Sequence, residues 1–220
     1  MFSPRYDILP LPQRRLCSEL GQVPRHFVLY GGTALALRLG HRVSLDFDFF
    51  SSEPFTPEEL LASLPFLSGA KVLQNVSRTL TVTVDRGGSV KLSFFGGLEL
   101  GRVGEPEGTE DGAITAASLL DLAGMKAAVI TQRAESKDYL DLLALLDNGV
   151  TLAEAMGAAR AIYGEQYNPV ITLKSLTYFG DGDLHRLGPE QKTRLLKIAT
   201  AQPLDLLVIP RLADKLAPAG

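Results

Sequence analysis

The sequence contains no tryptophan, one cysteine and three histidines among its 220 residues. The single thiol, Cys17, excludes an intramolecular disulfide, and so few cysteines and histidines exclude the ligand spacing of a structural zinc site. No apolar run reaches the roughly 18 residues that a membrane-spanning helix needs, and the N-terminus lacks the charged-then-apolar order of a signal peptide. We therefore expect a globular, cytoplasmic protein without a membrane partner.

The charge is low overall and unevenly distributed. The formal net charge is -3, which argues against a general electrostatic affinity for nucleic acid. Residues 43–183 hold twenty acidic and ten basic side chains, whereas residues 1–42 hold two and six, and residues 184–220 hold three and six. This distribution suits a carboxylate-rich metal site between surfaces that attract phosphate, and ordinary solvated faces explain it as well.

Apolar periodicity and turn residues predict strands in the first half of the chain and helices in the second. The pattern changes after the acidic stretch GEPEGTEDG at 104–112. We therefore expect an α+β fold, with a mixed sheet and flanking helices in residues 1–110 and a helical bundle in residues 111–220 that completes the active site. The expected strands are 27–30, 45–50, 71–76, 79–85, 90–95 and 98–103, and the expected helices are 12–20, 33–39, 54–65, 116–131, 136–147, 152–163, 173–179 and 189–200.

Two acidic residues interrupt an apolar strand in the segment VLYGGTALALRLGHRVSLDFDFF at 28–50. Side chains alternate across a strand, so Asp46 and Asp48 share one face and the neighbouring phenylalanines share the other. Two carboxylates held this close repel each other unless a cation or a proton lies between them. Mg²⁺ binds one or two carboxylates together with waters and substrate phosphates. The strand therefore predicts a magnesium site.

The same segment begins with a glycine turn, Gly31-Gly32-Thr33, directly before a predicted helix. Glycines at such a turn let the backbone approach a ligand, and the first amide N–H groups of the helix attract anions. Two glycines alone indicate only a tight turn. Together with Asp46 and Asp48 they predict a site for a nucleoside triphosphate and its metal.

These residues resemble the opening motif of the DNA polymerase beta-like nucleotidyltransferase superfamily, in which a glycine pair is followed, after a helix, by Asp-apolar-[Asp/Glu]-apolar. More narrowly, GGTALALRLGHRVSLDFDFF is similar to the AbiEii/AbiGii-type nucleotidyltransferase toxin family. The late segment LKSLTYFGDGD at 173–183 resembles a family motif that ends in an acid, here Asp181 or Asp183. The family pattern Lys…Arg…Lys-Asp-x-x-Asp-Leu is matched by Lys126, Arg133, Lys137, Asp138 and Asp141.

The resemblance implies a two-lobed, Mg²⁺-dependent enzyme with a nucleotidyltransferase-type sheet. Such an enzyme moves a nucleoside monophosphate from a triphosphate to an acceptor, which in the toxin branch can be the 3′ end of tRNA, and it has a cognate antitoxin as partner. Two metal ions would screen the charge of the attacking and leaving oxygens. The resemblance implies metal binding by Asp46 and Asp48, and nucleotide binding by Gly31, Gly32, Thr33, Lys126 and Lys137. The implied catalytic residues are Asp46, Asp48, Lys126, Lys137 and Asp138, of which Asp138 has a catalytic or orienting role.

The sequence departs from the superfamily on the strand VKLSFF, where a third acid is expected. Ser93 occupies that position, and a hydroxyl is a weak metal ligand and no general base. Asp85 is a weak substitute, because an acid beside Arg86-Gly87-Gly88 is typical of a turn. Ser93 motivates one alternative, a relative that binds nucleotide or RNA without turnover, and a module that binds an antitoxin or another partner is a second. Weaker substrate-binding candidates are Arg42, Lys91, Ser93, Arg133, Asp141 and Asp181.

Overall fold

The computed structural model describes residues 1–203 and 205–218. These residues form two compact units. The α+β class expected from the sequence is confirmed, with the sheet in unit 1 and a helical bundle in unit 2. The boundaries 1–110 and 111–220 stay a prediction, because contacts within one folded chain do not show which stretch folds alone. Unit 1 comprises Met1–Leu100, Glu105–Ser118 and Ala213–Gly220, and unit 2 comprises Gly101–Gly104 and Leu119–Leu212.

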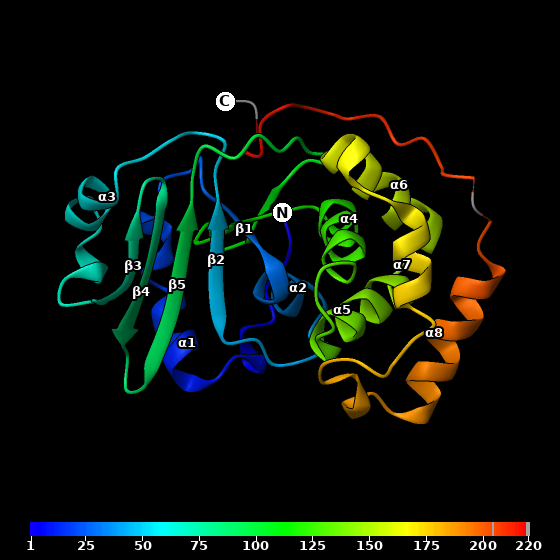
Figure 1. Ribbon diagram of the computed structural model, residues 1–220. Helices are drawn as coiled ribbons and strands as arrows, with labels where there is room; N and C mark the ends of the chain where they lie inside the picture. Colours follow the sequence, from blue (N-terminus) through cyan, green and yellow to red (C-terminus); the bar gives the residue numbers. More distant parts are fainter. Residues whose placement is uncertain (204, 219–220) are drawn as a thin grey trace. The chain divides into compact units, whose positions relative to one another are not determined.

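Unit 1 is built on a mixed sheet with the strand order β3-β4-β5-β2-β1-β7-β6 (Figure 1). The central strand β2 runs antiparallel to β1 and parallel to β5, and β7 runs parallel to β1. The strands are β1 (Val28–Tyr30), β2 (Asp46–Phe50), β3 (Lys71–Val76), β4 (Thr79–Asp85), β5 (Ser89–Phe95), β6 (Glu107–Gly108) and β7 (Thr115–Ala116).

Three α-helices flank this sheet in the described part of unit 1. Helix α1 packs on β5, and α2 packs on β1 and β2. Cys17, in α1, is buried, and burial raises the pKa of its thiol to about 12. The helices are α1 (Leu11–Cys17), α2 (Gly31–Leu39) and α3 (Pro57–Ser63), with short 3₁₀ turns at Tyr6–Ile8, Leu20–Gln22 and Pro65–Leu67.

Aromatic side chains from the inner face of the sheet form much of the unit 1 core. Phe47 and Phe49 of β2 are buried. The ring of Phe49 stacks on that of Phe94 from β5 at 5.3 Å between centroids, and Phe27 meets Phe94 edge-on at 5.4 Å. This packing fixes which face of β2 points inward, so the alternate residues of β2 must point outward.

The strand expected at 98–103 is wrong. The chain leaves β5 at Phe95 and turns at Gly97, whose φ of 63° lies in the left-handed region. The amide of Leu98 then donates to the carbonyl of Ser51 in a loop contact outside any strand. Two strands escaped prediction, because β6 and β7 have two residues each and show no periodicity. The pairing of Ala116 with β1 also delays the next helix, which begins at Leu119.

Unit 2 consists of helices in its described part (Figure 1). Helix α4 packs against α5 and α6, and α7 packs against α6 and α8. The helix predicted at 152–163 agrees with α6, which starts with a capping box between Thr151 and Glu154. Helix α7 lies earlier than predicted because Pro169 begins it. The helices are α4 (Leu119–Val129), α5 (Ser136–Asp147), α6 (Leu152–Tyr163), α7 (Pro169–Ser175) and α8 (Pro189–Ala201), with 3₁₀ turns at Gly164–Gln166 and Leu184–Arg186.

The chain returns to unit 1 after unit 2. Leu216 is 2% exposed, and its amide donates to Ser52 Oγ at 3.0 Å. Unit 1 is therefore assembled from segments separated by about a hundred residues of sequence.

None of the helices in the described ranges is, by itself, long and apolar enough to cross a membrane. Helix α5 and the segment Leu152–Gln166 meet that criterion only when they are taken together, and they are bent by 116°.

The close contact between α4 and α6 gives a testable prediction for unit 2. A Cβ atom on Gly124 would lie 2.9 Å from the backbone of both Ala158 and Ala159. Backbone cannot move aside cheaply, so we expect Gly124→Ala to lower the free energy of unfolding by about 1–3 kcal/mol, measured by urea denaturation. Gly108→Ala is the control, because a Cβ there would have nothing within 4 Å and the change should stay within about 0.5 kcal/mol. Equal losses in both variants would contradict the close contact.

Candidate active site

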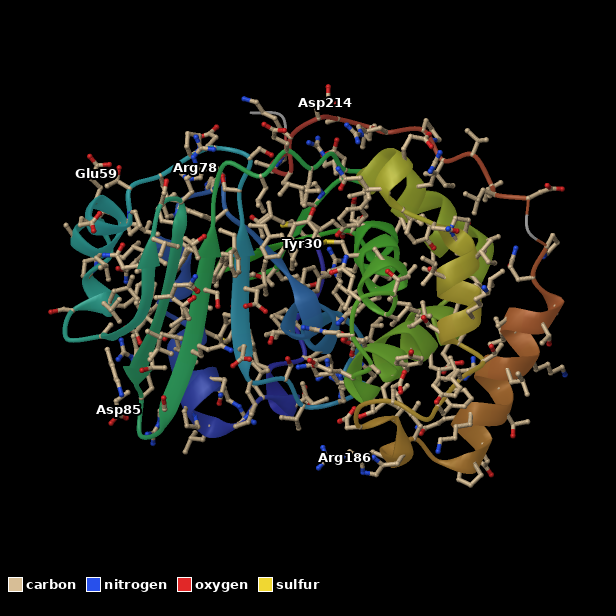
Figure 2. All side chains as sticks on the ribbon, viewed as in Figure 1. Tyr30, Glu59, Arg78, Asp85, Arg186 and Asp214 are labelled. Carbon is tan, nitrogen blue, oxygen red and sulfur yellow. The ribbon has the colours of Figure 1, made fainter. Side chains whose placement is uncertain are left out.

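The glycine turn predicted to bind phosphate lies where β1 meets α2. Tyr30 ends β1, and the helix begins directly at Gly31, whose φ of 73° suits glycine (Figure 2 labels Tyr30). A Cβ on Gly31 would lie 3.3 Å from Asp48 Oδ2. The Tyr30 side chain makes no capping hydrogen bond to the first turn of α2. The turn therefore places helix-start amides, which attract anions, beside a carboxylate.

Asp46 and Asp48 share the outward face of β2, as the alternation predicted. Both are partly exposed, whereas Phe47 and Phe49 between and beside them are buried. In the antiparallel pair of β1 and β2, Asp48 lies opposite Tyr30, the last residue before the turn. Two carboxylates on one strand face, next to a glycine turn, are a donor set that fits a hard divalent cation such as Mg²⁺.

The neighbouring strand β5 places two further polar side chains on this face. Lys91 lies opposite Asp46, and its Nζ is 3.0 Å from Asp46 Oδ2. Ser93 lies opposite Asp48 and is only 4% exposed. Within the described ranges, no group of three or more His, Cys, Asp or Glu side chains could hold a metal ion. The two acids of β2 are thus accompanied by a lysine and a serine on β5.

Asp85, the weak substitute for the third acid, serves the β4–β5 hairpin. Its Oδ1 accepts from the amides of Gly87 at 2.8 Å and Gly88 at 3.0 Å, and these bonds lower the pKa of its carboxyl (Figure 2). This contact agrees with the turn role that its sequence neighbours favour.

The Thr33 side chain points inward. It is 1% exposed, and its hydroxyl lies 2.8 Å from Ser44 Oγ and within hydrogen-bonding reach of the Asp46 carbonyl. Thr33 therefore ties the start of β2 to the first turn of α2, and only its backbone N–H is suited to a phosphate. Ser44, which takes part in this link, carried no motif in the sequence.

Arg42 lies over the glycine turn. A Cβ on Gly32 would come 2.5 Å from Arg42 Nη2, so the missing side chain leaves room for the guanidinium. Arg42 Nη1 donates to the carbonyl of Val43 at 3.0 Å, which helps to hold it there. The arrangement brings a permanent cation to the predicted phosphate position.

In unit 2, three of the family-pattern residues form a buried ion cluster. Lys126 of α4 is 6% exposed, and its Nζ is 2.6 Å from both Asp138 Oδ1 and Asp141 Oδ2 of α5. Asp138 and Asp141 are fully buried. Arg133 adds a second cation, with Nε 2.7 Å from Asp138 Oδ2 and Nη2 3.2 Å from Oδ1. The four charges balance, which offsets part of the cost of burying them.

Burial by itself would raise the pKa of the Asp138 carboxyl. The hydrogen bond from Arg133 and the charge and hydrogen bond of Lys126 outweigh burial, so the pKa lies below its ordinary value of 3.8. Asp138 is consequently a carboxylate at neutral pH and accepts from two cations.

The remaining candidates lie around this cluster with different exposure. Lys137 is half-exposed and pairs with Glu135 at 2.7 Å. Asp183 accepts from the amide and hydroxyl of Ser136 at the start of α5, with distances of 2.5 and 3.0 Å. It therefore holds a helix end in place, and its capping bonds lower the pKa of its carboxyl.

Asp181 lines an open hollow in unit 2 with a volume of about 190 Å³. Arg133 lies in the same wall, so the structure brings these two sequence candidates together. The other polar lining residues form no motif in the sequence, because they come from separate helices and loops. These are Thr131, Gln132, Tyr139, Ser175 and Tyr178.

The Asp138 contacts predict acid sensitivity of unit 2. Because the folded pKa is lowered, Asp138 stabilises the fold above its unfolded pKa, near 3.8, and this contribution is lost as the pH falls through the folded value. We expect the urea concentration at the unfolding midpoint to decrease as the pH is lowered from 5 to 3. Asp138→Asn should make this decrease smaller. Asp147→Asn, at an exposed pair with Arg194, is the matched surface control. An unchanged pH profile in Asp138→Asn would contradict the assignment.

Three comparisons with known proteins show what this chain is similar to. Residues 15–217 match the model of the family described as nucleotidyl transferase AbiEii toxin, type IV TA system. The uncharacterised protein aq_aa25 of Aquifex aeolicus (strain VF5) is 37% identical over 158 residues, which are 70% of this chain and 74% of that protein. A crystal structure of a candidate nucleotidyltransferase from H. pylori has a similar fold, with a TM-score of 0.53, 17% identity, and coverage of 86% of this chain and 91% of that one. With the family match extending over nearly the whole sequence, the chain belongs to the AbiEii nucleotidyltransferase toxin family of type IV toxin–antitoxin systems.

Proposed function

We propose that this chain transfers a nucleoside monophosphate from a nucleoside triphosphate to an acceptor. The observation that carries the proposal is the approach of Gly31 to Asp48, with Asp46 on the same strand face. A triphosphate needs N–H donors or cations for its oxygens and carboxylates for its metal, and this part of unit 1 offers both. Family membership supports the same reaction class.

The reaction needs positioning and electrostatics more than a protein nucleophile. The acceptor oxygen forms a bond to the α-phosphorus, and the bond to the oxygen that bridges to the β-phosphate breaks. Pyrophosphate leaves with that electron pair, and the hydroxyl proton passes to solvent. Asp46 and Asp48 would hold Mg²⁺, which would supply polarisation of the α-phosphate and screening of its charge.

We assign binding and positioning roles to residues of both units. The amides of Gly31, Gly32 and Thr33 bind phosphate oxygens, and Arg42 adds a cation above Gly32. In unit 2, Lys126 holds Asp138 and Asp141 in place, while the half-exposed Lys137 is free of such burial and suits the triphosphate. Arg133 and Asp181 line a hollow that suits a polar part of the substrate.

We propose RNA as the acceptor, with the 3′ end of tRNA as its form, and a cognate antitoxin as protein partner. Membership of a type IV toxin family supports the antitoxin. The RNA acceptor rests on the sequence resemblance to toxins whose acceptor can be the 3′ end of tRNA. The 3′-terminal ribose of an RNA supplies a hydroxyl that can act as the nucleophile.

Ser93 supports a second candidate function, nucleotide or RNA binding without turnover. It lies opposite Asp48 at the position of the expected third acid and is almost fully buried. A site with two carboxylates can bind a metal-bound triphosphate even when it activates no acceptor.

A radiolabel assay separates the two functions. We expect the protein, with Mg²⁺, one α-labelled nucleoside triphosphate at a time and total cellular RNA, to label the RNA. Asp48→Asn should reduce labelling by at least about 100-fold, because the metal loses a charged ligand, while the melting temperature stays within a few degrees. Asp85→Asn, an acid in the hairpin at the tip of β4, is the matched control and should keep its activity. Triphosphate binding without transfer to RNA or protein would favour the binding-only function.

The two family-pattern lysines should behave differently. Lys126→Met leaves two buried carboxylates without their shared cation, so we expect the free energy of unfolding to fall by about 3–5 kcal/mol. Lys137→Met removes only an exposed pair, worth about 0–1 kcal/mol, but should raise the KM for the triphosphate about tenfold. Urea denaturation and the labelling assay measure the two effects. A Lys137→Met enzyme with unchanged KM would remove Lys137 from the phosphate site.

A further inference from the structure

Lys91 shares the acidic face with Ser93, the residue that stands where a third metal-binding acid is expected. Its strand, β5, runs parallel to β2 in a register that sets Lys91 opposite Asp46 and Ser93 opposite Asp48. The Lys91 ammonium lies 3.0 Å from Asp46 Oδ2. The side of Asp46 that faces β5 is therefore already in contact with a cation.

The available ligands suit one divalent ion better than two. Two-metal sites hold their ions roughly 3.5–4 Å apart, and so much positive charge needs several carboxylates around it. The described residues include no third acid, histidine or cysteine close enough to complete such a set. Ser93, at the third position, contributes only a neutral hydroxyl.

The charges of the side chains on this face also favour one divalent ion over two. The Lys91 ammonium offsets one of the two negative charges of Asp46 and Asp48 before any metal ion binds. A second divalent ion would lie next to the Lys91 ammonium and would be repelled by it. Lys91 is close enough to the acids to act in this way, and its side chain is 40% exposed, so a substrate phosphate can reach it.

We propose that Lys91 supplies the positive charge that a second metal ion supplies in two-metal nucleotidyl transfer, so that the site works with a single divalent ion. The inference rests on the proposed function. Lys91 would screen the charge on Asp46 and on the substrate oxygens that react at the α-phosphorus. The bonds made and broken are those given above, and Lys91 neither gains nor loses a proton in them.

The first test counts ions without relying on activity. Mn²⁺ bound to the full chain is measured by electron paramagnetic resonance, at one molecule per chain of a triphosphate analogue with a methylene between the α- and β-phosphates. We expect one Mn²⁺ per chain, and its loss in Asp48→Asn. Two protein-bound Mn²⁺ per wild-type chain would overturn the inference.

The second test uses Lys91 variants, for which two measured quantities should move in opposite directions. Removing the competing cation in Lys91→Met should tighten Mn²⁺ binding about tenfold. Removing the electrostatic contribution to the reaction should slow nucleotide transfer about 100-fold. Lys91→Arg keeps the positive charge and should recover transfer to within about tenfold of the wild type.

Lys71→Met is the matched control, because Lys71 is an exposed lysine on β3, opposite Thr83. It should change neither Mn²⁺ binding nor transfer. A Lys91→Met enzyme with full transfer, or with weaker Mn²⁺ binding, would overturn the role of Lys91. If the wild type binds one Mn²⁺ that Asp48→Asn loses, yet labels no acceptor, the proposed transfer fails while the single-ion site stands.

Discussion

Electrostatic repulsion between Asp46 and Asp48 is the constraint on which the outward face of β2 depends. Residues two apart on a strand are about 7 Å from each other, so their mutual repulsion is about 0.6 kcal/mol in water and about 2.4 kcal/mol at an effective dielectric constant of 20. Both side chains are partly exposed, which favours the lower figure. An exposed ion pair between a lysine and a carboxylate stabilises a fold by about 0–1 kcal/mol. The contact between Lys91 and Asp46 can therefore offset the repulsion between the two acids before any ligand binds. The Lys91 contact therefore lowers the cost of placing two acids on one face of β2.

In unit 2 the paired charges are buried, whereas Asp46 and Asp48 of unit 1 are partly exposed. Lys126, Asp138 and Asp141 are withdrawn from water and joined by 2.6 Å contacts between two helices. A buried ion cluster of this kind adds little net stability over an apolar core, but it penalises any arrangement in which one partner is missing. Its effect is to specify how α4 and α5 pack. The nucleotide-binding role implied for Lys126 stays a prediction, and in the described fold its ammonium positions Asp138 and Asp141.

The sequence predicted the parts of the fold that depend on repeating patterns. The alternation in DFDFF was enough to assign β2 and to place Asp46 and Asp48 on one face, because buried phenylalanines leave only one choice of register. Strands β6 and β7 could not be predicted, since their two-residue lengths depend on pairing with distant partners. The contacts of Thr33 with Ser44 and of Lys91 with Asp46 could not be predicted either. The sequence does not indicate which loops and strands lie next to each other in the fold.

The return of Leu216 to unit 1 has a consequence for how the protein is made. The ribosome delivers residues in order, so the sheet with its glycine turn and acids emerges long before the segment that buries Leu216 against it. Unit 1 must therefore wait, with part of its apolar surface uncovered, until all of unit 2 has been synthesised. During that interval the uncovered apolar surface of unit 1 is open to non-native contacts, which makes unit 1 the part of the chain most exposed to misfolding.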